Sequence, residues 1–67
     1  MKNRIRVARA EIRMTQQQLA DATGVSRQTI NAIESGKFVP STVLALKMAR
    51  TFGLYVEELF ELEDEEK

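Results

Sequence analysis

The sequence predicts a compact all-α domain of five helices. Its 67 residues leave room for one domain, because a typical domain holds about 150 residues. Apolar residues recur at spacings of three and four along most of the chain, as they do on one face of an α-helix. Hydroxyl residues that can cap a helix start and glycines that can end one separate these stretches. A chain this short buries only about 60% of the surface that its unfolded state exposes, so efficient packing or a partner is needed to stabilise the fold.

The first helix is predicted over residues 2–13, with one apolar and one basic side. The apolar side holds Ile5, Ala8 and Ile12 at helical spacing. The basic side holds Lys2, Arg6, Arg9 and Arg13. Arg6 and Arg13 are equally consistent with phosphate contacts and with a solvated stripe.

Two short helices are predicted next, separated by residues 23–26. Thr15 and Gln18 have the spacing of a capping box, in which two side chains satisfy each other's backbone amides at a helix start. Gly24 can take the positive φ that ends this helix, and Ser26 can cap the following one. The predicted ranges are 16–22 and 27–35.

Two further helices complete the predicted domain, which spans residues 1–62. Ser41 can cap a helix that runs to Phe52, and a last helix carries Val56, Leu59 and Phe60. The buried stripe of the fourth helix is predicted to hold Leu44, Ala45, Met48, Ala49 and Phe52. Residues 63–67 are highly charged and predict a disordered acidic tail.

The zero net charge conceals a strong asymmetry along the chain. Residues 1–50 hold nine Lys or Arg and three acids, a net charge of +6, whereas residues 51–67 hold seven acids and one Lys, a net charge of −6. A basic body with an acidic tail fits a polyanion-binding face. It fits equally a solvated basic surface with a solubilising tail, so the charge alone leaves both interpretations open.

The composition excludes several function classes. The chain has no Cys and no His, which removes disulfides, the usual metal ligands and the Ser-His and Cys-His nucleophile pairs. We therefore expect no enzymatic activity, no metal, no cofactor and no small-molecule effector for this chain. Its longest apolar run, Val43–Leu46, is far shorter than the roughly 20 residues that span a bilayer. We expect a cytoplasmic protein without membrane contact.

Five stretches resemble the Cro and phage-repressor (XRE-type) family of helix-turn-helix transcriptional regulators. They are residues 14–20 (MTQQQLA), 24–30 (GVSRQTI), 33–37 (IESGK), 40–41 (PS) and 45–49 (ALKMA), and the resemblance extends over residues 2–62. It implies a lambda-repressor-like fold whose second and third helices form the helix-turn-helix. It also implies binding to double-stranded DNA, with the third helix in the major groove.

The resemblance places three base-reading residues on the third helix. Arg27 can donate two hydrogen bonds to guanine, while Gln28 and Asn31 can each pair in a two-pronged way with adenine. Ala32 stands at a base-contact position of the family but offers only a methyl group. The alternative for the three polar residues is an ordinary exposed helix face.

Backbone phosphates are expected to meet a second group of residues. These are Gln16 and Gln17 at the start of the second helix, and Ser35 and Lys37 around the end of the third. Free amides at a helix start favour an anion independently of any resemblance. The alternative for Gln16 is a good helix former that follows a cap. The alternative for Ser35 is a hydrogen bond to a free backbone group at the end of the helix.

The resemblance also implies an ion pair and a dimer. Arg9 and Glu34 correspond to the family's interhelical ion pair. The chain carries more apolar residues than one small core buries, which predicts a homodimer interface formed by Phe38, Val43, Leu46, Tyr55 and Phe60. A slightly larger core is the alternative. The predicted function is a repressor bound to a two-half-site operator, and the alternative is an antitoxin or anti-repressor subunit acting through protein contacts.

Overall fold

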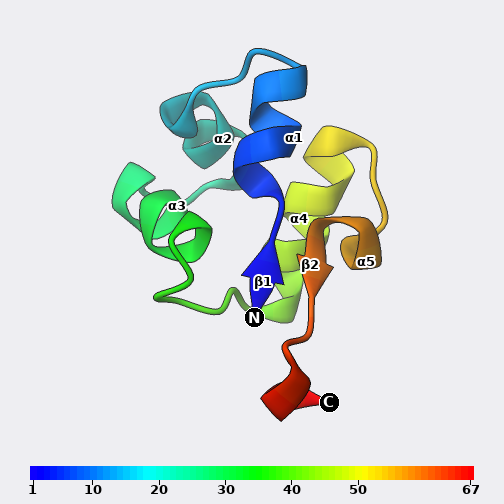
Figure 1. Cartoon of the computed structure of the whole chain (residues 1–67). Helices are drawn as coiled ribbons and strands as arrows, with labels where there is room; N and C mark the ends of the chain where they lie inside the picture. The colour runs from blue at the N-terminus through cyan, green and yellow to red at the C-terminus, as the bar shows by residue number, and fades with distance from the viewer.

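The computed structural model describes all residues 1–67 and confirms the helical fold class. Five helices are packed together within extents of 32 × 22 × 20 Å (Figure 1). They are α1 (Ile5–Glu11), α2 (Gln16–Thr23), α3 (Arg27–Glu34), α4 (Thr42–Phe52) and α5 (Val56–Leu59). The chain also forms two short strands, β1 (Lys2–Asn3) and β2 (Phe60–Glu61), and a last 3-10 turn at Asp64–Glu66. None of the helices combines the length and the apolar character that a membrane span requires.

Helices α2 and α3 form a helix-turn-helix whose caps match the sequence prediction. The Thr15 hydroxyl accepts a hydrogen bond from the Gln18 amide, and the Gln18 side chain accepts one from the Thr15 amide. Gly24 ends α2 with a φ of 76°, and the Ser26 hydroxyl accepts from the Thr29 amide at the start of α3. These local bonds fix the short turn through which α3 packs against α2 at the edge of the molecule (Figure 1).

Helix α1 is shorter than the predicted span of residues 2–13. Lys2 and Asn3 instead pair antiparallel with Glu61 and Phe60. The Asn3 side-chain oxygen accepts a hydrogen bond from the Ile5 amide, which lets the helix begin at Ile5. At the other end, Arg13 has a φ of 54°, which is incompatible with a continuing helix. The N- and C-terminal segments are therefore joined in a small β-ribbon that the sequence analysis does not predict.

The core lies where all five helices and the ribbon meet. Its largest fully buried side chains are Ile5, Leu19, Ile30, Ile33, Met48 and Leu59. Phe60, predicted for the dimer interface, is only 7% exposed and belongs to this core. Its pairing with Asn3 in the ribbon brings its side chain inward. The prediction of Phe60 at a surface is therefore wrong for the protomer.

The acidic tail contains the 3-10 turn at Asp64–Glu66 and lies beside the N-terminus. The ribbon brings the N-terminus beside it, and the Met1 ammonium lies 2.9 Å from Glu63 Oε2 and 3.2 Å from Glu66 Oε2. Hydrogen bonds to these two carboxylates raise the pKa of the ammonium. Opposite charges thus meet where the two ends of the chain come together, although the side chains of the tail remain mostly in solvent. The disorder of residues 63–67 stays a prediction.

Candidate nucleic-acid interface

The outer face of the helix-turn-helix gathers the predicted base-reading residues. Arg27, Gln28 and Asn31 are exposed on α3 and, together with Gln16 of α2, line an open hollow of about 340 Å³ without any apolar residue. The Arg27 guanidinium has no ion-pair partner in the protein. This face therefore offers hydrogen-bonding groups that a ligand can still engage.

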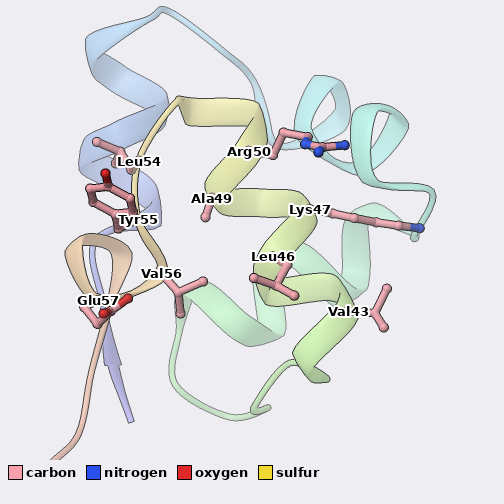
Figure 2. A pocket seen from close by; sticks show the side chains of 9 residues that line it. All are labelled: Val43, Leu46, Lys47, Ala49, Arg50, Leu54, Tyr55, Val56 and Glu57. Atoms are coloured by element: carbon pink, nitrogen blue, oxygen red, sulfur yellow. The ribbon is translucent and has the colours of Figure 1, made fainter.

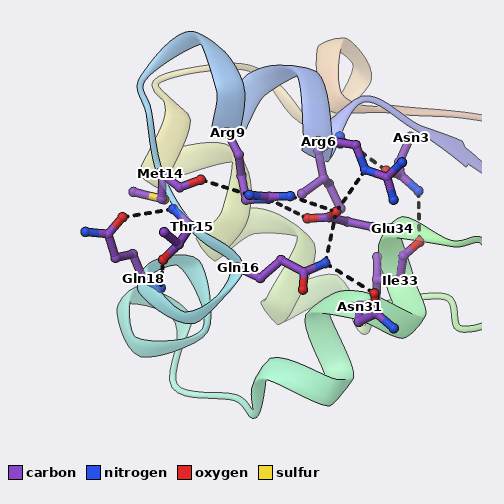
Figure 3. Close-up of polar contacts among 11 residues, drawn as sticks. Asn3, Arg6, Arg9, Met14, Thr15, Gln16, Gln18, Asn31, Ile33 and Glu34 are labelled. Carbon is purple, nitrogen blue, oxygen red and sulfur yellow. Dashed lines mark hydrogen bonds and ion pairs between the residues drawn. The ribbon is translucent and has the colours of Figure 1, made fainter.

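Gln16 joins the two helices of the motif. Its side-chain amide donates to Asn31 Oδ1 at 3.3 Å and to Glu34 Oε1 at 3.2 Å (Figure 3). The first contact leaves the Asn31 amide nitrogen available and limits its orientation. Gln16 thus acts as a brace between α2 and α3 in the free protein.

The other predicted phosphate contacts occupy both ends of the motif. Gln17, at the start of α2, donates to Asp21 one turn later at 2.9 Å. The Ser35 hydroxyl donates to the Ala32 carbonyl at 3.1 Å, as expected for a residue that satisfies the helix end. Lys37 is exposed in the loop that follows. Lys37 thus offers an exposed cation just beyond the end of α3.

A buried carboxylate ties α1 to the end of α3. Arg9 contacts Glu34 through two bonds, with Nε 2.6 Å from Oε2 and Nη2 3.1 Å from Oε1 (Figure 3). The Glu34 side chain is 1% exposed and the Arg9 side chain 15% exposed. Arg9 also donates to the Met14 carbonyl at 2.9 Å, so one guanidinium connects three segments. Arg6 lies 3.6 Å from the same carboxylate but is 74% exposed.

These partners set the protonation of Glu34. Burial by itself raises the pKa of this carboxyl, but hydrogen bonds from Arg9 and Gln16 and the charges of Arg9 and Arg6 outweigh it. The pKa of Glu34 is therefore below its ordinary value. The carboxylate stays ionised and holds α3 against α1 and α2.

Asn3 is a positioning residue that the sequence analysis misses. Its side-chain nitrogen donates to the Ile33 carbonyl in the last turn of α3 at 2.9 Å (Figure 3). The same side chain accepts from Ile5, so Asn3 links the β-ribbon, α1 and α3. The only available signal was an asparagine near a helix start, which is a common cap and gives no hint of a partner 30 residues away.

A second surface feature lies between α4 and α5, away from α3. It is a groove of about 760 Å³ (Figure 2), with apolar walls formed by Val43, Leu46, Ala49, Leu54, Tyr55 and Val56. Val43, Leu46 and Tyr55 are 62%, 56% and 79% exposed. Three of the five predicted interface residues thus meet in one groove. Phe38 is exposed on the preceding loop and does not line it.

Comparisons with known proteins agree with this architecture. Residues 5–59 match the helix-turn-helix family. The chain is 52% identical over 66 residues to the HTH-type transcriptional regulator MJ0272 of Methanocaldococcus jannaschii, covering 98% of this chain and 100% of that protein. It is 45% identical over 65 residues to the HTH-type transcriptional regulator YgzD of Bacillus subtilis, covering 97% and 98%.

A solved structure has the same fold. It is the restriction-modification controller protein C.AhdI of Aeromonas hydrophila, with a TM-score of 0.78 and 32% identity. The match covers 85% of this chain and 86% of that one. The similarity therefore extends over most of both chains rather than over the helix-turn-helix alone.

Proposed function

This chain belongs to the helix-turn-helix family of transcriptional regulators, and we propose that it is a repressor that binds a two-half-site operator as a homodimer. The observation that carries the proposal is the polar outer face of α3. It presents Arg27, Gln28 and Asn31 beside Gln16 with no apolar residue between them. Side chains of this kind at the front of a recognition helix read base edges in the major groove.

Each of the three residues has a distinct role in the proposal. Arg27 donates to O6 and N7 of a guanine, and Gln28 pairs with N6 and N7 of an adenine. Asn31 reads a further base through the amide nitrogen that Gln16 leaves free. Because Gln16 restrains Asn31, part of the ordering cost is met before DNA arrives.

Phosphate contacts at the two ends of the motif fix the register of α3. The first amides of α2, at Gln16 and Gln17, can donate to a DNA phosphate at this helix start, where the helix dipole favours an anion. Lys37 supplies an exposed cation beyond the end of α3. These contacts support affinity without regard to base sequence.

Dimerisation is proposed to use the groove between α4 and α5. Val43, Leu46 and Tyr55 expose apolar surface there that a second copy would cover. Burial of apolar surface yields about 25 cal/mol per Å² before the cost of association. Two recognition helices related by a two-fold axis would then read half-sites roughly 34 Å apart.

The same groove favours the second candidate function. An antitoxin or anti-repressor subunit would use its apolar walls to hold a different protein, and the helix-turn-helix could still contact DNA. Such a subunit would be monomeric when alone, whereas the leading proposal requires a homodimer.

Selection of bound sequences from a random duplex pool tests the DNA proposal. On the selected duplex, Arg27→Ala and Gln28→Ala should each weaken binding by about 1–3 kcal/mol, or roughly 5- to 150-fold. Each variant should relax the preference at one base position. Lys37→Ala is the matched control, since it removes a phosphate contact and should weaken cognate and random duplexes alike. Equal losses on both duplexes for the α3 variants would refute base reading.

Sedimentation of paired leucine variants tests the dimer. Leu46 and Leu62 are 56% and 50% exposed, but only Leu46 lines the groove. Leu46→Glu should give a folded monomer that binds a single half-site, whereas Leu62→Glu should stay dimeric. Wild-type protein that is monomeric at high micromolar concentration, or two variants with the same dimer affinity, would contradict the proposed interface.

A further inference from the structure

The groove between α4 and α5 has one basic rim and one acidic rim. Lys47 and Arg50 stand on the α4 side, and Glu57 stands on the α5 side (Figure 2). Leu46, Ala49 and Val56 lie between the two rims in this view. The groove therefore separates opposite charges across an apolar floor.

All three charged side chains lack an ion-pair partner within the protomer. Each is exposed, and the ion pairs of the chain involve other residues. The Glu58 carboxylate, next in sequence to Glu57, is by contrast occupied by the Tyr55 amide at 2.8 Å. Lys47, Arg50 and Glu57 are thus free to pair with charges brought by another molecule.

We propose that a second copy of this chain seats in the groove with its acidic rim against the basic rim of the first, so that Glu57 of each copy pairs with Lys47 and Arg50 of the other. This inference rests on the homodimer proposed above and adds its orientation and its choice of partner. A two-fold interface repeats every contact, so one chain that carries both rims supplies two sets of ion pairs.

Charge selects between the two ways of placing the two-fold axis. An axis that runs along the groove exchanges its two sides, and the basic rim of one copy then meets the acidic rim of the other. An axis that runs across the groove keeps each side in place and would set Lys47 and Arg50 against their own symmetry mates. Like charges placed opposite each other suppress an assembly, so the axis along the groove is favoured.

Charge reversal on one rim at a time tests the arrangement in the full-length chain. Glu57→Lys should weaken the homodimer about tenfold or more, because the exposed contact is lost and a like charge enters at two symmetric places. Lys47→Glu combined with Arg50→Glu should do the same. Glu65→Lys is the control, since Glu65 is an exposed acid outside the groove, and it should leave the dimer affinity within about twofold.

Mixing the two reversed chains tests whether these charges meet across the interface. In an equimolar mixture every contact is again between opposite charges, so a heterodimer should form with an affinity close to that of the wild type. Sedimentation with one chain fluorescently labelled measures it. A Glu57→Lys chain that dimerises like the wild type, or reversed chains that fail to associate with each other, would overturn the orientation while leaving a wild-type dimer intact. A monomeric wild type would overturn the dimer itself.

Discussion

Removal of the Arg9 guanidinium should be among the most damaging single changes to this protein. Arg9→Met keeps the aliphatic part of the side chain but removes both bonds to Glu34 and the bond to the Met14 carbonyl. The Glu34 carboxylate, 1% exposed in the wild type, would keep only the Gln16 amide at 3.2 Å and the exposed Arg6 guanidinium at 3.6 Å. An ionised carboxylate in such a place is costly.

The expected loss in the free energy of unfolding follows from the burial of Glu34 and from the partners that Glu34 keeps in the variant. Breaking a buried pair by removing one partner costs about 3–5 kcal/mol. Gln16 and Arg6 still face Glu34, so we expect about 2–4 kcal/mol for Arg9→Met. A chain of 67 residues has a total stability of roughly 3–10 kcal/mol. The melting temperature of a domain this small changes by about 4–8 °C per kcal/mol, so it should fall by roughly 8–32 °C.

Arg6→Met provides the matched control in the same measurement. Arg6 faces the same carboxylate, but at 3.6 Å and with 74% of its side chain exposed, so its loss should cost no more than about 0.5 kcal/mol. Thermal and urea unfolding of the wild type and both variants measure the difference. Equal losses for the two arginines, or less than about 1 kcal/mol for Arg9→Met, would refute a dry ion pair between α1 and α3.

Three further predictions concern pH, the acidic tail and the turns. The pKa of Glu34 in the folded protein lies below its ordinary value of 4.5, so its contribution to the free energy of unfolding is complete above that pH and is lost as the pH falls below it. The stability advantage of the wild type over Glu34→Gln should therefore shrink below about pH 4.5 in unfolding experiments. Truncation after Leu62 should leave the helical circular dichroism signal unchanged. It should tighten binding to a random duplex at low salt, because it removes acids that repel phosphates. A gain in affinity that persists at high salt would contradict this cause. Gly24 has a φ of 76° with open space around it, so Gly24→Ala should lower the free energy of unfolding by about 1 kcal/mol through backbone strain alone. Arg13 has a φ of 54°, so Arg13→Gly should leave the free energy of unfolding unchanged or raise it in the same assay.

The helix-turn-helix could be predicted from the sequence because its signals are local. The Thr15–Gln18 capping box, Gly24 and Ser26 each act within a few residues, and the structure places the helix ends within one residue of the predicted ranges. The polar face of α3 follows from the same register. The Arg9–Glu34 contact came only from the family resemblance, since nothing local links residues 25 positions apart.

The β-ribbon could not be predicted, and the errors in the sequence analysis follow from it. Its strands hold two residues each and pair across almost the full length of the chain. Such short strands carry no periodic pattern, and the helical spacing of the residues that follow extends the predicted helix over Lys2 and Asn3. The surplus of apolar residues predicts Phe60 at a surface, whereas its burial depends on the ribbon. The surplus of apolar residues was visible in the sequence, but only the packing of α5 on α4 shows which of them line one groove.

Methylation interference on a selected duplex tests the central claim most directly, because one reagent probes both grooves. Dimethyl sulfate modifies guanine N7 in the major groove and adenine N3 in the minor groove, and modified duplexes that no longer bind identify the contacted bases. With two copies of α3 in successive major grooves, interference should fall on guanine N7 in two clusters about one helical turn apart, and Arg27→Ala should remove it at one guanine of each cluster. Interference confined to adenine N3, or a single cluster, would contradict the account.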